Sequence, residues 1–173
     1  DEAVAEGAVV VLQLDSPGTM GQDAVAIADT VASLPVPVLV WVGTVPARAS
    51  GAGLLLLYAS SLAAVAPGSQ TGPLTPVDML HPEDEPADLD AAIDGWLEAR
   101  GRTVQREYED EAMTAQQALD RGFAEEAAVS VPALLAKVDG RTVPTPEGPV
   151  TLSTRIATEV PITRASSNTV TPA

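Results

Sequence analysis

The sequence predicts an α/β fold with a mainly parallel sheet flanked by helices, and three observations support this prediction. Three runs of aliphatic and β-branched residues, at 8–15, 38–42 and 62–66, have the length and composition of strands that are buried on both faces. Segments with helical periodicity separate these runs, and the links between them are short. Alternation of strand and helix implies right-handed crossovers between parallel strands.

Composition determines how the core is filled and which partners are excluded. The chain has 173 residues, 46% hydrophobic and only 3% aromatic, so small aliphatic side chains must fill the core of one domain. A formal net charge of −15 argues against nucleic acid and against anionic lipid, because both require a positive surface. The chain has no cysteine and one histidine, which excludes thiol catalysis and multi-histidine metal sites. We therefore expect no metal and no cofactor.

Turn residues divide the first half of the chain into alternating elements. Ser16-Pro17-Gly18 ends the first strand, and Pro35-Val36-Pro37 separates the first helix from the second strand. The predicted order is strand 8–15, helix 23–33, strand 38–42, a helix that opens at 48–53, and strand 62–66.

The second half begins with an acidic, proline-rich loop at 73–88 and continues with helices. Gly101 ends one helix, Thr114 is a plausible N-cap for another, and Gly122 follows that helix as its C′ residue. The predicted order is helix 88–100, helix 105–113, helix 115–121, strand 127–129, helix 131–138, and strands at 150–152 and 156–160.

Several blocks resemble one protein family in order and spacing. They are VLQLDSPG (11–18), LPVPVLVWVG (34–43), ARASGAG (47–53), LAAVAPGSQTG (62–72), MTAQQALDRGFAEEAA (113–128) and ALLAKVDGRTV (133–143). Together they resemble the NfeD-type membrane-bound serine proteases of the ClpP class, in the ClpP/crotonase superfamily. The resemblance implies stacked ββα units. It divides the chain into a ClpP-class domain at 1–143 that lacks its first strand–helix unit, an extension with edge strands at 144–164, and a flexible tail or linker at 165–173.

The resemblance also implies acyl transfer by a serine–lysine dyad, with backbone N–H groups of a Pro-Gly-Gly turn holding the oxyanion. Counted without gaps, the serine position falls on Gly51, and Ser50 stands one residue early. Ser50 is either the nucleophile after a local register change or a cap for the helix that begins near Gly51. The oxyanion and peptide groove would comprise Pro17, Gly18, Thr19 and Gly51, with β-branched Thr19 standing where a second glycine is expected.

The base of the dyad has no direct counterpart. The family lysine falls near Asp84, while Lys137, the only lysine, lies on a late helix where we expect it to be solvated. Arg48 cannot act as a base because a guanidinium does not deprotonate. His81, oriented by Asp84 or Asp88, is the remaining candidate base for the serine, or else a solvated loop residue.

These departures favour a catalytically impaired NfeD-like homologue that acts as a binding or assembly domain of a membrane protein. The alternative is an active serine endopeptidase that uses Ser50 and His81. A crotonase-type acyl-CoA enzyme is disfavoured, because no basic cluster is present to hold the CoA phosphates. The resemblance implies a peptide or protein ligand in the groove, a stomatin-like membrane protein and further copies of the chain as partners.

The resemblance places the domain on the extracytoplasmic side of a membrane. The most apolar stretch of the chain, 54–66, is too short to span a bilayer, which takes about 20 residues. We therefore expect any membrane anchor to lie outside this chain.

Overall fold

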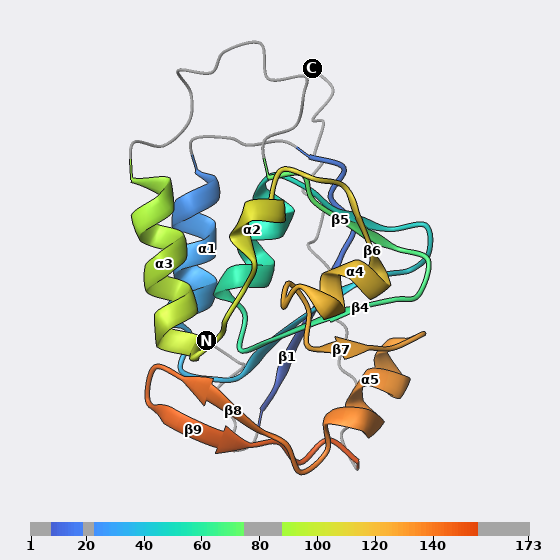
Figure 1. The fold of residues 1–173 in the computed structure, drawn as a ribbon. Coiled ribbons are helices and arrows are strands. Elements are labelled where there is room, and N and C mark those ends of the chain that lie inside the picture. The colour runs from blue at the N-terminus through green and yellow to red at the C-terminus, as the bar shows by residue number, and fades with distance from the viewer. Residues whose placement is uncertain (1–7, 19–22, 75–87, 156–173) are drawn as a thin grey trace, which may run out of the picture.

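The structure is a computed structural model that describes residues 8–18, 23–74 and 88–155. A four-stranded sheet crosses its centre in the order β1-β2-β4-β7, and all three strand pairs are parallel (Figure 1). The strands are β1 (Val10–Leu14), β2 (Val38–Val42), β4 (Leu62–Val65) and β7 (Glu126–Ala127). The predicted parallel α/β architecture is confirmed.

Helices cover both faces of this sheet, as Figure 1 shows. On one face lie α1 (Ala24–Ser33), α2 (Ala52–Ala59) and α3 (Leu89–Arg100), and α4 (Ala115–Asp120) adds Ala115 and Ala118 to the core on that side. Helix α5 (Val131–Val138) packs on the other face. A hydrophobic core lies on each face of the sheet, and β2 contributes to both. Val40 packs into the core under α1, α2 and α3, whereas Leu39 and Trp41 pack into the core under α5. No helix within the described ranges is both long enough and apolar enough to cross a membrane.

A second, smaller sheet lies beside the start of α2. It consists of β3 (Arg48–Ala49), β5 (Gln70–Thr71) and β6 (Met113–Thr114), with two residues in each strand. Such short strands carry no periodicity, which is why the sequence did not predict them. A parallel bridge joins Ser16 to Ala49, so the segment that follows β1 lies next to β3.

Local helix signals are confirmed in detail. Thr114 forms a capping box with Gln117 at the start of α4 (Ala115–Asp120). Gly101 (φ 62°) and Gly122 (φ 81°) follow the ends of α3 and α4 in a backbone region that favours glycine.

The predicted helix at 105–113 is wrong, because only a 3₁₀ turn, η2 (Arg106–Tyr108), forms there. Its flanking backbone groups pair with distant segments instead of with each other. The Gln105 N–H donates to the Arg121 carbonyl at 2.9 Å, and the Glu109 carbonyl accepts from the Leu74 N–H at 2.7 Å. Tertiary hydrogen bonds therefore override the local helical preference.

The described chain ends in a hairpin of β8 (Thr142–Thr145) and β9 (Gly148–Thr151). Val143 on β8 and Leu152 after β9 pack into the same core as α5. The predicted strand at 156–160 and the tail at 165–173 lie outside the described residues. The domain boundaries after residues 143 and 164 stay predictions.

Candidate functional site

The turn between β3 and α2 carries Ser50 and Gly51, the two residues to which the resemblance points for the nucleophile position. Gly51 is the N-cap of α2 and has φ 54° and ψ −123°, a conformation that is costly for any residue with a side chain. Backbone bonds hold this turn on both sides. The Ser50 N–H donates to the Ser16 carbonyl, and the Gly51 N–H donates to the Pro73 carbonyl, each at 3.0 Å.

Ser50 turns its hydroxyl into the protein. The residue is only 4% exposed, and its Oγ donates a hydrogen bond of 2.7 Å to the Gly72 carbonyl. The hydroxyl thus bonds to the segment after β5 rather than to the first N–H groups of α2. Ser50 has no hydrogen bond to a titratable side chain in the part of the chain that the structure describes.

The predicted oxyanion turn lies against this site. Ser16 bridges to β3, and a Cβ placed on Gly53 in the first turn of α2 would lie 3.1 Å from the Ser16 Cβ. Pro17 and Gly18 follow directly, and Gly18 has φ 109°, a value that favours glycine. The fold therefore brings Pro17 and Gly18 close to the turn that holds Gly51. Thr19 lies outside the described residues.

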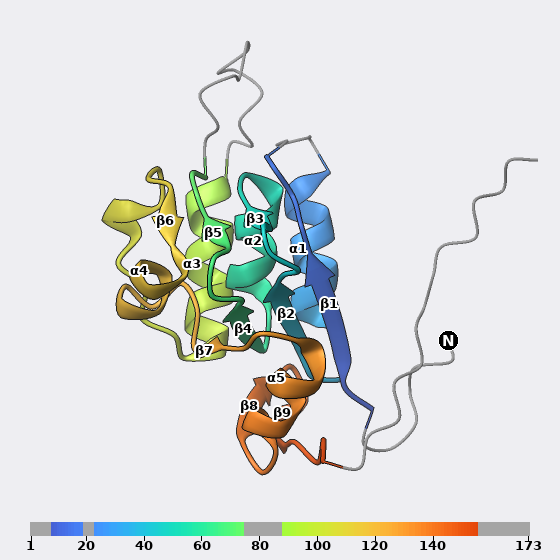
Figure 2. The same cartoon turned by 90° about the vertical axis from the view of Figure 1, so that its right-hand side faces the viewer.

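The candidate bases do not join this site within the described ranges. His81 and Asp84 lie outside those ranges, and Asp88 is the N-cap residue of α3. Lys137 donates to the Ala127 carbonyl at 2.6 Å and to Glu126 at 3.2 Å, beside β7. Figures 1 and 2 both show α5, which carries Lys137, at the opposite end of the molecule from β5, and Figure 2 shows β3 next to β5.

Two charged residues, Arg48 and Asp15, lie beside this turn, and neither has a hydrogen bond to the Ser50 hydroxyl among the described residues. Arg48 on β3 is exposed, and its backbone N–H donates to Asp15 at 3.0 Å. Among residues 8–18, 23–74 and 88–155, no group of three or more acidic or histidine side chains could hold a metal ion.

Two buried arginines at the far end of α2 were not anticipated from the sequence. Arg100 donates through Nε and Nη2 to the Ala59 carbonyl, and Arg102 donates through Nη1 to the Leu57 carbonyl. Both carbonyls lie in the last turn of α2, where intrahelical partners are missing. Burial lowers the pKa of both guanidinium groups, but each remains a cation opposite the negative end of the helix dipole. They fix the helix whose other end holds Gly51.

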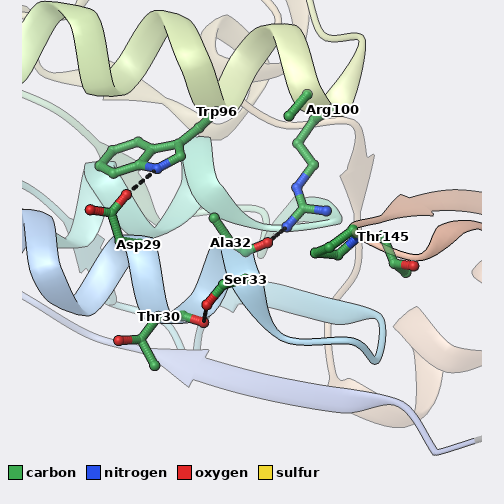
Figure 3. A pocket seen from close by; sticks show the side chains of 9 residues that line it. Asp29, Thr30, Ala32, Ser33, Trp96, Arg100 and Thr145 are labelled. Carbon is green, nitrogen blue, oxygen red and sulfur yellow. Dashed lines mark hydrogen bonds between the residues drawn. The ribbon is translucent and has the colours of Figure 1, made fainter.

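A hollow of about 580 Å³ lies between α1, α3 and the hairpin, as Figure 3 shows. Two of its polar side chains bond to groups in its own wall. The Trp96 indole N–H donates to Asp29 at 2.8 Å, and Arg100 donates to the Ala32 carbonyl at 2.8 Å. The hollow lies beside the C-terminal end of α2, about 12 Å along that helix from the Gly51 turn. It is therefore separate from the candidate site.

Solved structures show what the chain is similar to, whereas no protein-family model and no curated protein sequence matches it. A mutant of the 1510-N membrane-bound stomatin-specific protease, in complex with a substrate peptide, is 25% identical and has a TM-score of 0.72. That match covers 84% of this chain and 73% of the protease chain. The 1510-N membrane protease from Pyrococcus horikoshii, described as specific for a stomatin homolog, is 24% identical. This second match covers 84% of the present chain and 71% of the Pyrococcus horikoshii chain, with a TM-score of 0.66.

A putative polyketide-biosynthesis enoyl-CoA hydratase from Bacillus subtilis shares the fold more distantly. It is 15% identical over 78% of this chain and 59% of its own, with a TM-score of 0.50. The parallel sheet, the turn before α2 and these matches agree with the resemblance in the sequence. The chain thus has the fold of the membrane-bound stomatin-specific protease, which is the NfeD-type, ClpP-class fold that the resemblance implies.

Proposed function

We propose that the chain is a catalytically impaired ClpP-class domain that binds a peptide segment beside Gly51. The conformation of Gly51 is the observation that carries this proposal. A sharp, strained turn from strand to helix is how α/β-hydrolases present a nucleophilic serine, and here a residue without a side chain occupies such a turn. Hydrolysis would lack its attacking group.

The chemistry around Ser50 supports the same proposal. Activation of a serine requires a base within hydrogen-bond reach of its Oγ. The Ser50 Oγ instead donates to a backbone carbonyl, which cannot remove its proton at neutral pH. The Lys137 ammonium group donates a hydrogen bond to the Ala127 carbonyl beside β7 and does not contact Ser50.

The binding role is supported by the peptide found in the relative. That relative is described as membrane-bound, stomatin-specific and in complex with a substrate peptide. We therefore propose a peptide from a stomatin-like membrane protein as the ligand of the groove at Pro17, Gly18, Thr19 and Gly51. We further propose that the domain lies on the extracytoplasmic side of a membrane and assembles with other copies of itself.

Fluorophosphonate labelling, read by intact mass, tests the loss of catalysis. We expect no adduct on the folded native chain or on Ser50→Ala. A single stoichiometric adduct that disappears in Ser50→Ala would contradict the proposal and support the endopeptidase alternative. Labelling of His81→Ala would then test the base in that alternative.

Cysteine scanning tests which residue faces the groove, since the native chain has no cysteine to interfere. We expect iodoacetamide to alkylate Gly51→Cys at least about tenfold faster than Ser50→Cys, because a thiol at a helix N-terminus has a lowered pKa and Ser50 is buried. Circular dichroism should first establish that both variants fold. Faster alkylation of Ser50→Cys would mean that Ser50, not Gly51, faces the groove.

A further inference from the structure

The outward face of the small sheet carries an exposed arginine immediately before the Gly51 turn. Successive residues of a strand point to opposite faces of a sheet. Ala49 on β3 and Thr71 on β5 pair with each other and are fully buried. Their neighbours Arg48 and Gln70 also pair with each other, and both are exposed. Arg48 and Gln70 therefore lie side by side on the outward face, on the two strands that Figure 2 shows next to each other.

Arg48 differs from the other cations of the described chain in having no partner for its charge. The Arg100 guanidinium is buried and donates to backbone carbonyls. The remaining described cations each form an ion pair with a carboxylate, namely Arg102, Arg106, Arg121, Lys137, Arg141 and Arg155. Within residues 8–18, 23–74 and 88–155, the Arg48 guanidinium has neither a hydrogen bond nor an ion pair. An unpaired arginine in a chain of net charge −15 indicates a place for an anionic partner.

The fold fixes the backbone of Arg48 and leaves its side chain free. The Arg48 N–H donates to Asp15 Oδ1 at 3.0 Å, and the Arg48 carbonyl accepts from the Ser16 N–H at 2.7 Å. Strand β3 thus has described neighbours on both sides, the segment at Asp15 and Ser16 and strand β5, so its place does not depend on residues that precede β1. Gly51 follows Arg48 by three residues, which span at most about 10 Å.

The chemistry of this pair of side chains suits a carboxylate. A guanidinium donates two parallel N–H groups to the two oxygens of a carboxylate. The carboxamide of Gln70 supplies a further donor from a strand about 4.8 Å away. We propose that Arg48, together with Gln70, binds a single carboxylate of the peptide ligand, next to the segment that lies over Gly51. This inference rests on the proposed function, because it names a feature of the peptide that the groove binds.

The charge of the chain limits the ligand to one carboxylate. A run of acidic residues would be repelled by the net charge of −15 and by Asp15, which is exposed beside Arg48. Charges further apart than about 8–10 Å are largely screened at physiological salt, so one carboxylate in contact with Arg48 gains more than it loses. The expected ligand therefore carries one acidic side chain, or a free C-terminus, among uncharged residues.

Matched peptide mixtures test this inference on the whole chain. Two mixtures of seven-residue peptides with blocked ends contain Ala, Val, Leu, Ser and Thr at the outer positions and either Glu or Gln at the centre. Equilibrium dialysis, read by mass spectrometry, gives the ratio of bound Glu peptides to bound Gln peptides. We expect a ratio of at least about five for the native chain. A third mixture, with central Gln and a free C-terminal carboxylate, distinguishes a chain end from an acidic side chain as the source of the carboxylate.

Four variants assign the preference to Arg48. In Arg48→Gln the ratio should fall below one, because the remaining surface repels the carboxylate. Arg48→Lys keeps the charge without the planar fork and should give an intermediate ratio. Asp15→Asn keeps the acceptor for the Arg48 N–H and removes a repelling charge, so the ratio should rise. Arg141→Gln alters an exposed arginine beside Glu126 and should leave the native ratio unchanged. Urea denaturation first establishes that each variant folds as stably as the native chain.

The outcomes separate this inference from the groove proposal. Equal binding of the Glu and Gln mixtures by the native chain would overturn the role of Arg48 and leave the groove proposal standing. Binding of none of the three mixtures would count against the groove and therefore against both. A preference for Glu that Arg48→Gln leaves unchanged would assign the carboxylate to another group. If the native chain shows no preference and Arg48→Gln alters its sedimentation, Arg48 contacts a second copy of the chain and the inference is wrong.

Discussion

Replacing Arg100 by methionine tests whether a buried cation holds the end of α2. The side chain is 7% exposed and donates only to backbone carbonyls. Nη2 bonds to the Ala32 carbonyl at 2.8 Å and to the Ala59 carbonyl at 3.1 Å, Nε bonds to the Ala59 carbonyl at 3.2 Å, and Nη1 bonds to the Pro144 carbonyl at 3.1 Å. Methionine keeps much of the aliphatic stem and removes every one of these donors.

The size of the effect follows from the carbonyls that lose their partner. Those of Ala32 and Ala59 lie in the last turns of α1 and α2, where a helix leaves its C=O groups unpaired. Each buried acceptor without a donor costs about 1–3 kcal/mol. Relief from burying the guanidinium, the same burial that lowers the pKa of Arg100, offsets part of this loss. We expect the free energy of unfolding to fall by about 3 kcal/mol.

Urea denaturation followed by tryptophan fluorescence measures this change, because Trp96 lies one helical turn before Arg100 on α3. Arg141→Met is the matched control. Arg141 is 40% exposed and pairs with Glu126 at 3.3 Å, so its loss should cost no more than about 1 kcal/mol. An Arg100→Met variant no less stable than this control would refute the reasoning.

Two further predictions concern pH. Hydrogen bonds from the backbone N–H groups of Thr154 and Arg155 lower the pKa of Asp139, so its contribution to stability is present above the unfolded pKa of about 4 and is lost as pH falls through the folded value. The protection of the Thr154 amide, meaning its exchange rate relative to the intrinsic rate at the same pH, should fall in acid, and Asp139→Ala should show that loss of protection at neutral pH; full protection in the variant would contradict this anchor. Burial, followed by the charge of Glu109, raises the pKa of Tyr58, so stability should decline as pH rises above about 10. Thermal unfolding from pH 9 to 11 measures that decline, which Tyr58→Phe should reduce, and an unaltered slope would argue against it.

Elements with strong local signals were predictable from the sequence. Strand β2 and helix α5 have the bounds that were predicted, because one is a bounded run of aliphatic residues and the other has Pro132 in its first turn. The Thr114 cap was predictable for the same reason, since a capping box involves only four neighbouring residues.

The candidate site was predictable only in part. The gapless count along the family blocks assigned the nucleophile position to Gly51, and the φ of Gly51 agrees with a turn that favours glycine. The partner of Ser50 could not be predicted, because the Gly72 carbonyl is 22 residues away and belongs to a segment without periodicity. The failed helix at 105–113 has the same cause, since its backbone partners lie on other segments.

The sequence by itself determined the alternation of strands and helices, the small aliphatic core and the departures from the serine–lysine pattern. Each of these properties depends on residues that are close together along the chain. Only the tertiary structure decided that Ser50 points inward and that two arginines hold the far end of α2. These features arise from hydrogen bonds and packing between distant segments, and they exist only once the chain has closed around its core.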